Sequence, residues 1–269
     1  RGAWLGPKSA IRSPQFTMNL KPSRVLARLR QGETVSCVKL NLSDARVAEL
    51  AALCGHACIW LDLEHVPNTL AVIEQQIRAA GWNGAETIVR VARGSYSDLI
   101  RPLELDAAGI MVPHIMSLAD AQAVVRQTRF HPVGRRPVDG GNADGGFTMI
   151  DFKAYIEAAN RERMVIVQIE DPEPMAELDA IAAVEGIDML FFGPGDFSHA
   201  IGAPGDLNDP RVREARRRVA DAARRHGKFA GTVGSRQNWD ELKSLGYRFI
   251  NVGSDVVGLA AYFRAILPG

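Results

Sequence analysis

The sequence predicts an α/β protein, a (β/α)8 TIM barrel built as a single domain, and three observations lead to this fold class. Short apolar or β-branched runs alternate with longer runs whose apolar residues recur every three or four positions, the pattern of repeated βα units. Eight strand candidates occur in the 269 residues, a length that suits one barrel. No Gly-x-Gly-x-x-Gly follows the first of them, which disfavours the alternative, a doubly wound open sheet.

The expected elements alternate along the chain in a regular order. Strands are predicted at residues 35–40, 58–63, 87–92, 109–113, 164–170, 189–193, 229–233 and 249–253. Helices are predicted at residues 44–53, 70–80, 98–106, 118–127, 151–160, 174–184, 209–226, 237–245 and 256–266. The capping signals are Ser43, Ser117 and Ser235 before helices, and Gly55, Gly81, Gly186, Gly227 and Gly246 after them.

Two segments fall outside this pattern. Residues 1–20 are basic and contain no Asp or Glu, so we expect them to be an extension, native or vector-derived, ahead of a barrel domain at residues 21–269. Residues 132–148 hold five glycines and two prolines. A loop of that length inside a compact domain is usually functional.

Composition narrows the class of partner. The 32 Lys and Arg residues nearly balance the 31 Asp and Glu residues, giving a net charge of +1 that argues against nucleic acid or an anionic membrane. The sequence has no apolar run long enough to cross a bilayer and no signal-peptide pattern. Cys37, Cys54 and Cys58 are odd in number and lie in apolar segments, so we expect buried thiols in a reducing compartment, the cytoplasm.

Polar residues gather where the expected strands end, which in a barrel of this kind is the end that carries the active site. They are Asp62 and His65 after the second strand, Arg90 in the third, Gln168 and Glu170 at the end of the fifth, and Asp196 after the sixth.

Glu170 and Asp196 are the candidate metal ligands. Strand alternation places Glu170 on the same face as Gln168, after a run of buried residues. Neighbouring strands lie about 4.8 Å apart, so the two carboxylates could share one divalent cation whose other positions are filled by water. Alternatively, Glu170 pairs with an arginine of the barrel, and Asp196 caps a helix that begins at Phe197.

Asp62, His65 and Arg90 are the candidate catalytic residues. His65 lies three residues after Asp62, close enough for the carboxylate to fix the tautomer of the imidazole and make it a general base. A local hydrogen bond of His65 is the alternative. Arg90 either pairs with Glu170 for stability or stabilises an oxyanion that forms on the substrate.

Taken together, these segments resemble the HpcH/HpaI aldolase/citrate lyase family of metal-dependent pyruvate aldolases. The resemblance covers residues 35–267. The segments that carry it, in the family's order and at similar spacing, are Trp60-Leu61-Asp62-Leu63-Glu64-His65, Val89-Arg90-Val91, Val112-Pro113-His114, Val167-Gln168-Ile169-Glu170 and Phe192-Gly193-Pro194-Gly195-Asp196.

The resemblance implies a class II aldolase that reversibly cleaves 2-oxo-4-hydroxy acids into pyruvate or hydroxypyruvate and an aldehyde through a metal-bound enolate. Glu170 and Asp196 match the ligands of a divalent metal ion such as Mg²⁺, Mn²⁺ or Co²⁺. The other matches are Arg90 at the keto oxygen, Asp62 and His65 as a proton-transfer dyad, Gln168 in the pocket, Gly193, Pro194 and Gly195 at the pyruvate carboxylate, and Asp106 reaching the dyad from a neighbouring subunit.

The family also implies a homo-oligomer, a hexamer, in which the final helix packs on a neighbour. Here that helix has an apolar face of Leu259, Ala260, Phe263 and Ile266. The chain departs from the family at Leu63, where glycine is common, and at Gly134-Arg135-Arg136-Pro137, where Gly-x-Arg-Gly is usual. Both departures touch the acceptor side, for which Arg135, Arg136, Asp139 and Asn142 are candidate contacts. A solvated loop is the alternative explanation of these four residues.

Four alternatives remain at this point. The chain could be another enolate-forming carbon–carbon bond enzyme of the same superfamily, or a Schiff-base aldolase that uses Lys39 at the end of the first strand. It could be a sugar-phosphate isomerase or synthase whose phosphate site is built from Gly231, Gly234 and Gly253. The last alternative is a catalytically silent assembly module.

Overall fold

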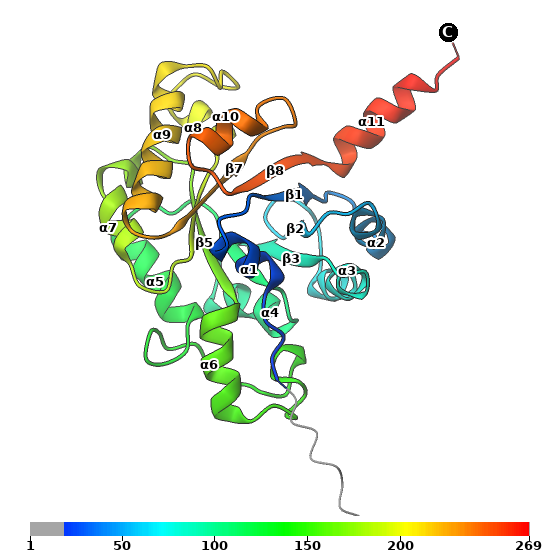
Figure 1. Ribbon diagram of the computed structural model, residues 1–269, viewed down its shortest axis with the longest axis vertical. Helices are drawn as coiled ribbons and strands as arrows, with labels where there is room; N and C mark the ends of the chain where they lie inside the picture. The colour runs from blue at the N-terminus through cyan, green and yellow to red at the C-terminus, as the bar shows by residue number, and fades with distance from the viewer. Residues whose placement is uncertain (1–18, 269) are drawn as a thin grey trace, which may run out of the picture.

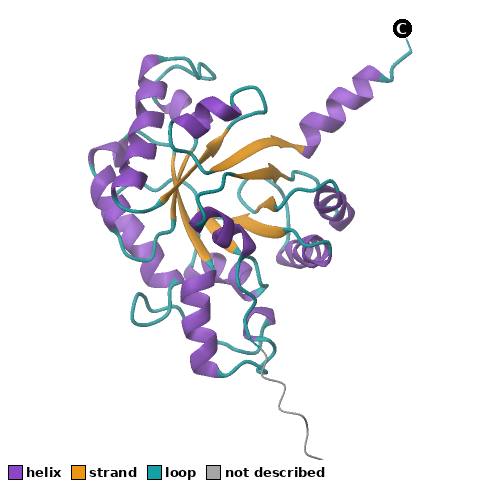
Figure 2. Ribbon diagram, viewed as in Figure 1, coloured by secondary structure: helices purple, strands orange, loops and turns teal. Residues whose placement is uncertain are grey.

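A computed structural model describes residues 19–268, and their eight strands form one closed parallel barrel in the order β1 to β8 (Figure 2). Each strand pairs with the next along the chain, and β8 returns to pair with β1. The strands are β1 (Val35–Lys39), β2 (Cys58–Asp62), β3 (Glu86–Arg90), β4 (Gly109–Val112), β5 (Met164–Ile169), β6 (Met189–Phe192), β7 (Phe229–Val233) and β8 (Phe249–Ser254). The predicted fold class, a (β/α)8 barrel, is confirmed.

Helices surround the barrel and close one of its ends (Figure 1). They are α1 (Arg24–Arg30), α2 (Ala45–Leu53), α3 (Leu70–Trp82), α4 (Tyr96–Glu104), α5 (Leu118–Thr128), α6 (Phe152–Glu162), α7 (Leu178–Ala183), α8 (Pro194–Ala200), α9 (Pro210–Arg225), α10 (Trp239–Ser244) and α11 (Asp255–Ala265). Two short 3-10 helices, η1 (Ala143–Gly145) and η2 (Glu173–Ala176), lie in the connections.

The predicted strands all form, each within two residues of its expected bounds. The prediction missed α1 and α8, and the single helix expected at residues 174–184 is two pieces, η2 and α7. The division into an extension at residues 1–20 and a barrel domain stays a prediction, because residues 1–18 lie outside the described part of the chain.

Three of the predicted capping residues are wrong. Asp44, rather than Ser43, caps α2 by accepting a hydrogen bond from the Arg46 amide. Ser235 caps no helix because α10 begins later, at Trp239. Gly81 lies inside α3, and the left-handed residue that follows this helix is Gly84, with φ of +85°.

The interior of the barrel is filled by side chains from alternate positions of the strands. Trp60 of β2 and Phe191 of β6 meet across it, edge to face, with ring centres 5.5 Å apart. At the amino-terminal end, α1 buries Val25, Leu26 and Leu29 against the same cluster. Helix α1 therefore plugs that end, and the carboxyl ends of the strands are left to carry a site.

The segment between α5 and β5 lies at the plugged end of the barrel. Helix α5 runs back from the carboxyl end of β4, so the long loop and α6 that follow it are at the amino-terminal end (Figure 1). A buried ion pair, Arg136 Nη2 to Asp144 Oδ2 at 2.9 Å, holds the loop together. The Tyr155 hydroxyl donates a hydrogen bond to the same carboxylate at 2.7 Å.

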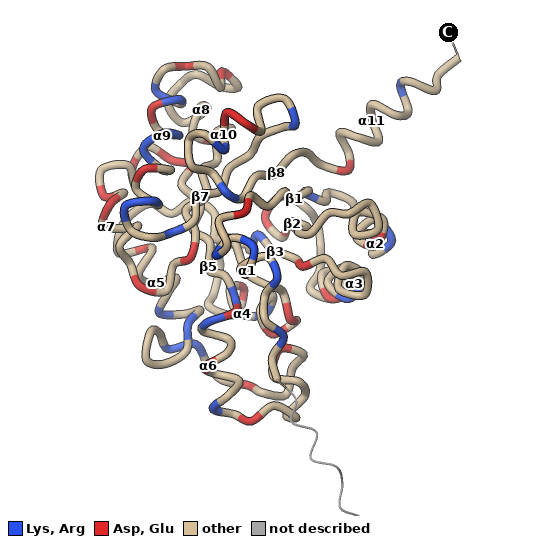
Figure 3. Tube along the Cα trace, viewed as in Figure 1, with Lys and Arg blue, Asp and Glu red and all other residues tan. Residues whose placement is uncertain are grey.

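Helix α11 points away from the barrel (Figure 1) and none of its residues is buried. Only Asp255 and Arg264 are charged in it, so Figure 3 shows it almost entirely uncharged. The predicted apolar residues Leu259, Phe263 and Ile266 are exposed, as are Tyr262 and Leu267.

Cysteine burial follows the prediction at two of three positions. Cys37 and Cys58 are buried inside the barrel, but Cys54 is exposed because it follows the last turn of α2. Within residues 19–268, no helix combines the length and the apolar character needed to cross a membrane.

Candidate active site

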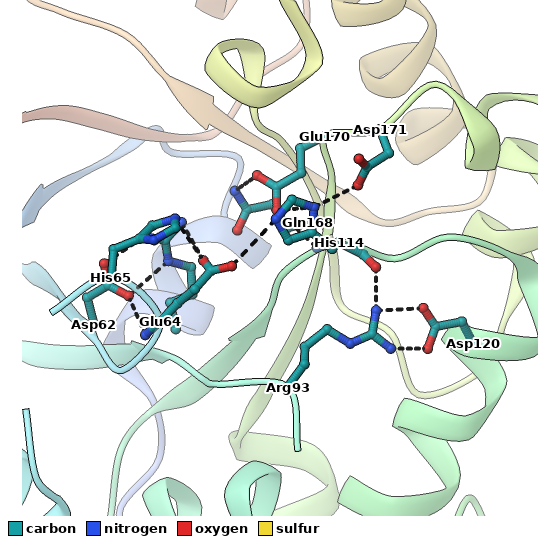
Figure 4. Close-up of polar contacts among 10 residues, drawn as sticks. Asp62, Glu64, His65, Arg93, His114, Asp120, Gln168, Glu170 and Asp171 are labelled. Atoms are coloured by element: carbon teal, nitrogen blue, oxygen red, sulfur yellow. Dashed lines mark hydrogen bonds and ion pairs between the residues drawn. The ribbon is translucent and has the colours of Figure 1, made fainter. Parts of the chain in front are cut away.

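Polar side chains from four strands converge at the open, carboxyl-terminal end of the barrel (Figure 4). Asp62 ends β2, Arg90 ends β3 and Gln168 and Glu170 lie at the end of β5. The structure thus brings together the residues that strand alternation placed on the inner face. It also adds Lys39, the last residue of β1.

Asp62 and Arg90 form the centre of the site. Asp62 has no exposed surface, and its two oxygens accept hydrogen bonds from Arg90 Nε at 3.0 Å and Nη2 at 2.6 Å. Lys39 Nζ lies 2.8 Å from Asp62 Oδ2, and Arg90 Nη1 lies 2.9 Å from Glu64 Oε2. The guanidinium also lies over the Trp60 ring, 4.9 Å from its centre.

This network fixes the charge of Asp62. Burial alone would raise the pKa of Asp62, but the hydrogen bonds and positive charges of Arg90 and Lys39 outweigh it and hold the pKa at about 2. The carboxylate is therefore ionised at any physiological pH and keeps the guanidinium of Arg90 in one orientation.

Glu170 is the second fully buried carboxylate of the site. Its Oε1 accepts a hydrogen bond from the His114 amide at 3.0 Å, and Gln168 Nε2 donates to its Oε2. Gly193 lies directly against it, since a Cβ at that position would come within 2.5 Å of Glu170 Oε2. A residue larger than glycine at 193 would displace the carboxylate.

The surroundings of Glu170 disfavour its ionised form. Burial raises its pKa to about 7 even though the His114 amide opposes the shift, and the negative charges of Asp196 and Glu64 add to the rise. Asp196 is exposed in the first turn of α8. It does not cap a helix beginning at Phe197, because α8 begins at Pro194 with Gly193 as its N-cap.

The negative charge of Asp196 therefore disfavours the ionised form of Glu170. Among residues 19–268, no group of three or more His, Cys, Asp and Glu side chains is arranged to hold a metal ion.

His65 forms no hydrogen bond or ion pair with Asp62 in the structure. Its ring is more than half exposed, with Nε2 3.6 Å from Glu64 Oε2 (Figure 4). Asp62 has no free oxygen for the imidazole, since Arg90, Lys39 and the Glu64 amide already occupy both. In the structure Asp62 therefore does not orient His65, and the role of the two residues in proton transfer stays a prediction.

A different histidine lies beside the buried acid. His114 Nδ1 is 2.8 Å from Asp171 Oδ2, and its Nε2 is 3.6 Å from Glu64 Oε1. Arg93 pairs with Asp120 and donates to the His114 carbonyl, which fixes this turn (Figure 4). The sequence places His114 in a family segment but predicts no role for it. The only sign in the sequence that a histidine could be bound here is the pair of consecutive acidic residues Glu170 and Asp171.

Asp106 and the long loop lie at the other end of the barrel. Asp106 precedes β4, in the left-handed region with φ of +71°, and pairs with Arg163 at 2.5 Å. Burial raises the pKa of Asp106 despite that arginine. Arg135, Arg136, Asp139 and Asn142 follow α5 and lie at the same end, so within one chain none of these residues reaches Glu170.

Two of the three glycines offered for a phosphate site, Gly231 and Gly234, are explained by packing. A Cβ at Gly231 would come within 2.7 Å of the Phe191 ring, and one at Gly234 within 2.4 Å of Leu242. Both positions require glycine because buried side chains occupy the space.

We expect the stability of the metal-free protein to fall between pH 5 and pH 7. The pKa of Glu170 rises from 4.5 to about 7 on folding, so in this window the folded protein retains a proton that the unfolded chain has lost. The free energy of unfolding then decreases with rising pH, by about 2 to 3 kcal/mol in total from this group. Urea unfolding in EDTA at several pH values measures it. The Glu170→Gln variant should lack this component, and equal slopes in both proteins would contradict the assignment.

Comparison with known proteins identifies the family. A family model described as HpcH/HpaI aldolase/citrate lyase matches residues 36–261. A hydroxypyruvate/pyruvate aldolase of Pseudomonas aeruginosa is 34% identical over 250 residues, 93% of each chain. A 2-keto-3-deoxy-L-rhamnonate aldolase of Klebsiella pneumoniae subsp. pneumoniae is 31% identical over 230 residues, 85% of this chain and 86% of that one.

The fold agrees with this assignment. The crystal structure of an HpcH/HpaI aldolase from Desulfitobacterium hafniense DCB-2 superimposes with a TM-score of 0.85 at 26% identity, covering 91% of this chain and 97% of the other. The chain therefore belongs to the HpcH/HpaI aldolase/citrate lyase family, as its sequence motifs predicted, and is a carbon–carbon lyase.

Proposed function

We propose that this chain is a class II aldolase that reversibly cleaves 2-oxo-4-hydroxy acids into pyruvate or hydroxypyruvate and an aldehyde. The observation that carries the proposal is the presence, at the open end of the barrel, of both a buried carboxylate with a raised pKa, Glu170, and a guanidinium held in place by Asp62, Arg90. The name of the hydroxypyruvate/pyruvate aldolase relative supports the same donors, and the name of the 2-keto-3-deoxy-L-rhamnonate aldolase relative supports a 2-oxo acid as substrate.

The donor set fits a divalent cation. Glu170 and Asp196 repel each other without one, and Gln168 Oε1, beside Glu170, is buried with no hydrogen-bond partner. Hard oxygen ligands of this kind suit Mg²⁺ or Mn²⁺, and Co²⁺ also accepts them. Glu170 and Asp196 would hold the ion, which when bound would act as a Lewis acid toward the oxygens of the 2-oxo acid.

Arg90 supplies the fixed positive charge. Its Nε and Nη2 are held by Asp62 and its Nη1 by Glu64, so the guanidinium does not reorient when negative charge develops on the keto oxygen of the substrate. A preorganised positive charge stabilises the enolate more than the neutral ketone, which lowers the barrier to removing a proton from the substrate.

The turn at the start of α8 would bind the substrate carboxylate. Gly193, Pro194 and Gly195 form it, and Gly195 has open space where a side chain would be. Because the first amides of a helix lack partners within it, they can donate to a carboxylate.

Proton transfer to and from the aldehyde oxygen would involve His65, whose ring is solvent-facing at the mouth of the site. Asp62 would contribute by holding Arg90, since it does not touch His65 here. Asp106 would take part only from a second copy of the chain, and we propose the homo-oligomer, a hexamer in the cytoplasm, that the family resemblance implies.

The test is proton exchange at the donor without any aldehyde. In D₂O the protein should exchange the methyl protons of pyruvate, followed by ¹H NMR, in the presence of Mg²⁺, Mn²⁺ or Co²⁺ but not after EDTA treatment. Borohydride added with pyruvate should leave the protein mass unchanged. Exchange that persists in EDTA together with a covalent adduct at Lys39 would instead establish a Schiff-base mechanism.

A further inference from the structure

Lys39 is an inward-facing residue of the active-site layer. Val35 and Cys37 of β1 pack in the interior of the barrel, and alternation places Lys39 on the same face at the end of the strand. Its side chain is 17% exposed, its Nζ lies 2.8 Å from Asp62 Oδ2, and it lies 5.6 Å from the centre of the Trp60 ring. A lysine inside a barrel requires a reason beyond packing.

Lys39 and Arg90 share one carboxylate oxygen. Asp62 Oδ2 accepts from Arg90 Nη2 at 2.6 Å and faces Lys39 Nζ at 2.8 Å, while Asp62 itself has no exposed surface. Arg90 pairs with Glu64 through its remaining nitrogen. Lys39 therefore holds Asp62 from β1, while Arg90 holds it from β3, the strand on the other side of β2.

The charges of this cluster balance only with Lys39. Lys39 and Arg90 carry two positive charges, and Asp62 and Glu64 carry two negative ones. Without Lys39 the cluster would hold one uncompensated negative charge near Glu170. The negative charge of Glu170 already acts on Arg90, whose pKa it helps to raise. The net negative charge of the cluster would then oppose the formation of an enolate there.

We propose that Lys39 is a positioning residue for the aldolase reaction: it fixes Arg90 through Asp62 and cancels the excess negative charge of the cluster where the enolate forms. The inference rests on the proposed function. Lys39 is not a Schiff-base nucleophile in this role, because an ammonium paired with a carboxylate has no free electron pair to attack a carbonyl.

The experiment compares Lys39→Met, which keeps a long side chain but removes its charge, with Lys39→Arg, which keeps the charge. The rate of metal-dependent deuterium exchange into pyruvate should fall on the order of 10- to 100-fold in Lys39→Met, mainly in kcat and with less change in KM. Lys39→Arg should recover most of the rate. Lys153→Met is the matched control, since Lys153 pairs with Glu157 on an exposed face of α6 and its loss should leave exchange unchanged.

The outcomes separate the two proposals. Wild-type protein that exchanges no deuterium with metal would refute the proposed function. Wild-type exchange with an equally active Lys39→Met would overturn only the role of Lys39. A loss of melting transition in both Lys39→Met and Lys39→Gln would make Lys39 a structural residue and also overturn it. A Lys39→Arg variant as inactive as Lys39→Met, with a borohydride adduct in the wild type, would assign Lys39 as a nucleophile instead.

Discussion

Replacing Glu170 by glutamine should reduce metal-dependent exchange and aldehyde release on the order of a thousandfold. Glutamine has nearly the same shape, so the backbone of β5 should not move, but it has no charge for a cation. It also offers one oxygen where Glu170 accepts from both the His114 amide and Gln168 Nε2. Calorimetric titration with Mn²⁺ should show the loss of binding directly.

The same variant should be at least as stable as the wild type at neutral pH. Glu170 is buried beside Asp196 and Glu64, so the neutral amide avoids a desolvated negative charge. Glu157→Gln, on the exposed face of α6, is the control and should change neither property. Turnover of Glu170→Gln within about threefold of the wild type, with the metal still required, would place the ion elsewhere.

Replacing Arg90 by methionine should impair both stability and catalysis. The side chain is 5% exposed and satisfies both oxygens of Asp62. Breaking a buried ion pair from one side usually lowers the free energy of unfolding by about 3 to 5 kcal/mol. Lys39 still neutralises Asp62 here, so we expect the lower end, measured by urea unfolding. The exchange rate should fall on the order of 100- to 1000-fold.

A double variant separates the two effects. Asp62→Asn combined with Arg90→Met removes both members of the buried pair, which should restore part of the stability because the fully buried carboxylate of Asp62 is no longer left without Arg90. Exchange should stay as low as in the single variant, since the charge that stabilises the enolate is still absent. A double variant that regains activity would show that Arg90 acts only by folding the site.

The arrangement of the strands and the buried acid could be predicted because each depends on local pattern. Glu170 lies two residues after Gln168, and alternation along one strand decides that both face inward. Closure of the barrel then brings the ends of β2, β3 and β5 together without further information.

The partners of Asp62 could not be predicted in the same way. His65 is three residues away in the sequence, whereas Lys39 comes from the neighbouring strand β1 and Arg90 from β3. Register between strands, not distance along the chain, sets which side chain reaches a carboxylate, and Asp62 lies directly opposite Arg90 in the pairing of β2 with β3. The prediction of Ser43 as a helix cap was wrong for a related reason. Ser43 and Asp44 are both suitable N-cap residues, and the residue at which the backbone becomes helical decides which of them is the cap.

The placement of Asp106 at the plugged end of the barrel has a consequence for oligomers that mix two variants of the chain. A barrel cannot bend to bring its two ends together, so any help that Asp106 gives to chemistry is given to another molecule. If chains with a substitution at Asp106 assemble with chains that have a substitution at Arg90, some sites would then combine an intact Arg90 from one chain with an intact Asp106 from its neighbour. Two inactive proteins could in that way complement each other, which no enzyme complete within a single chain can do.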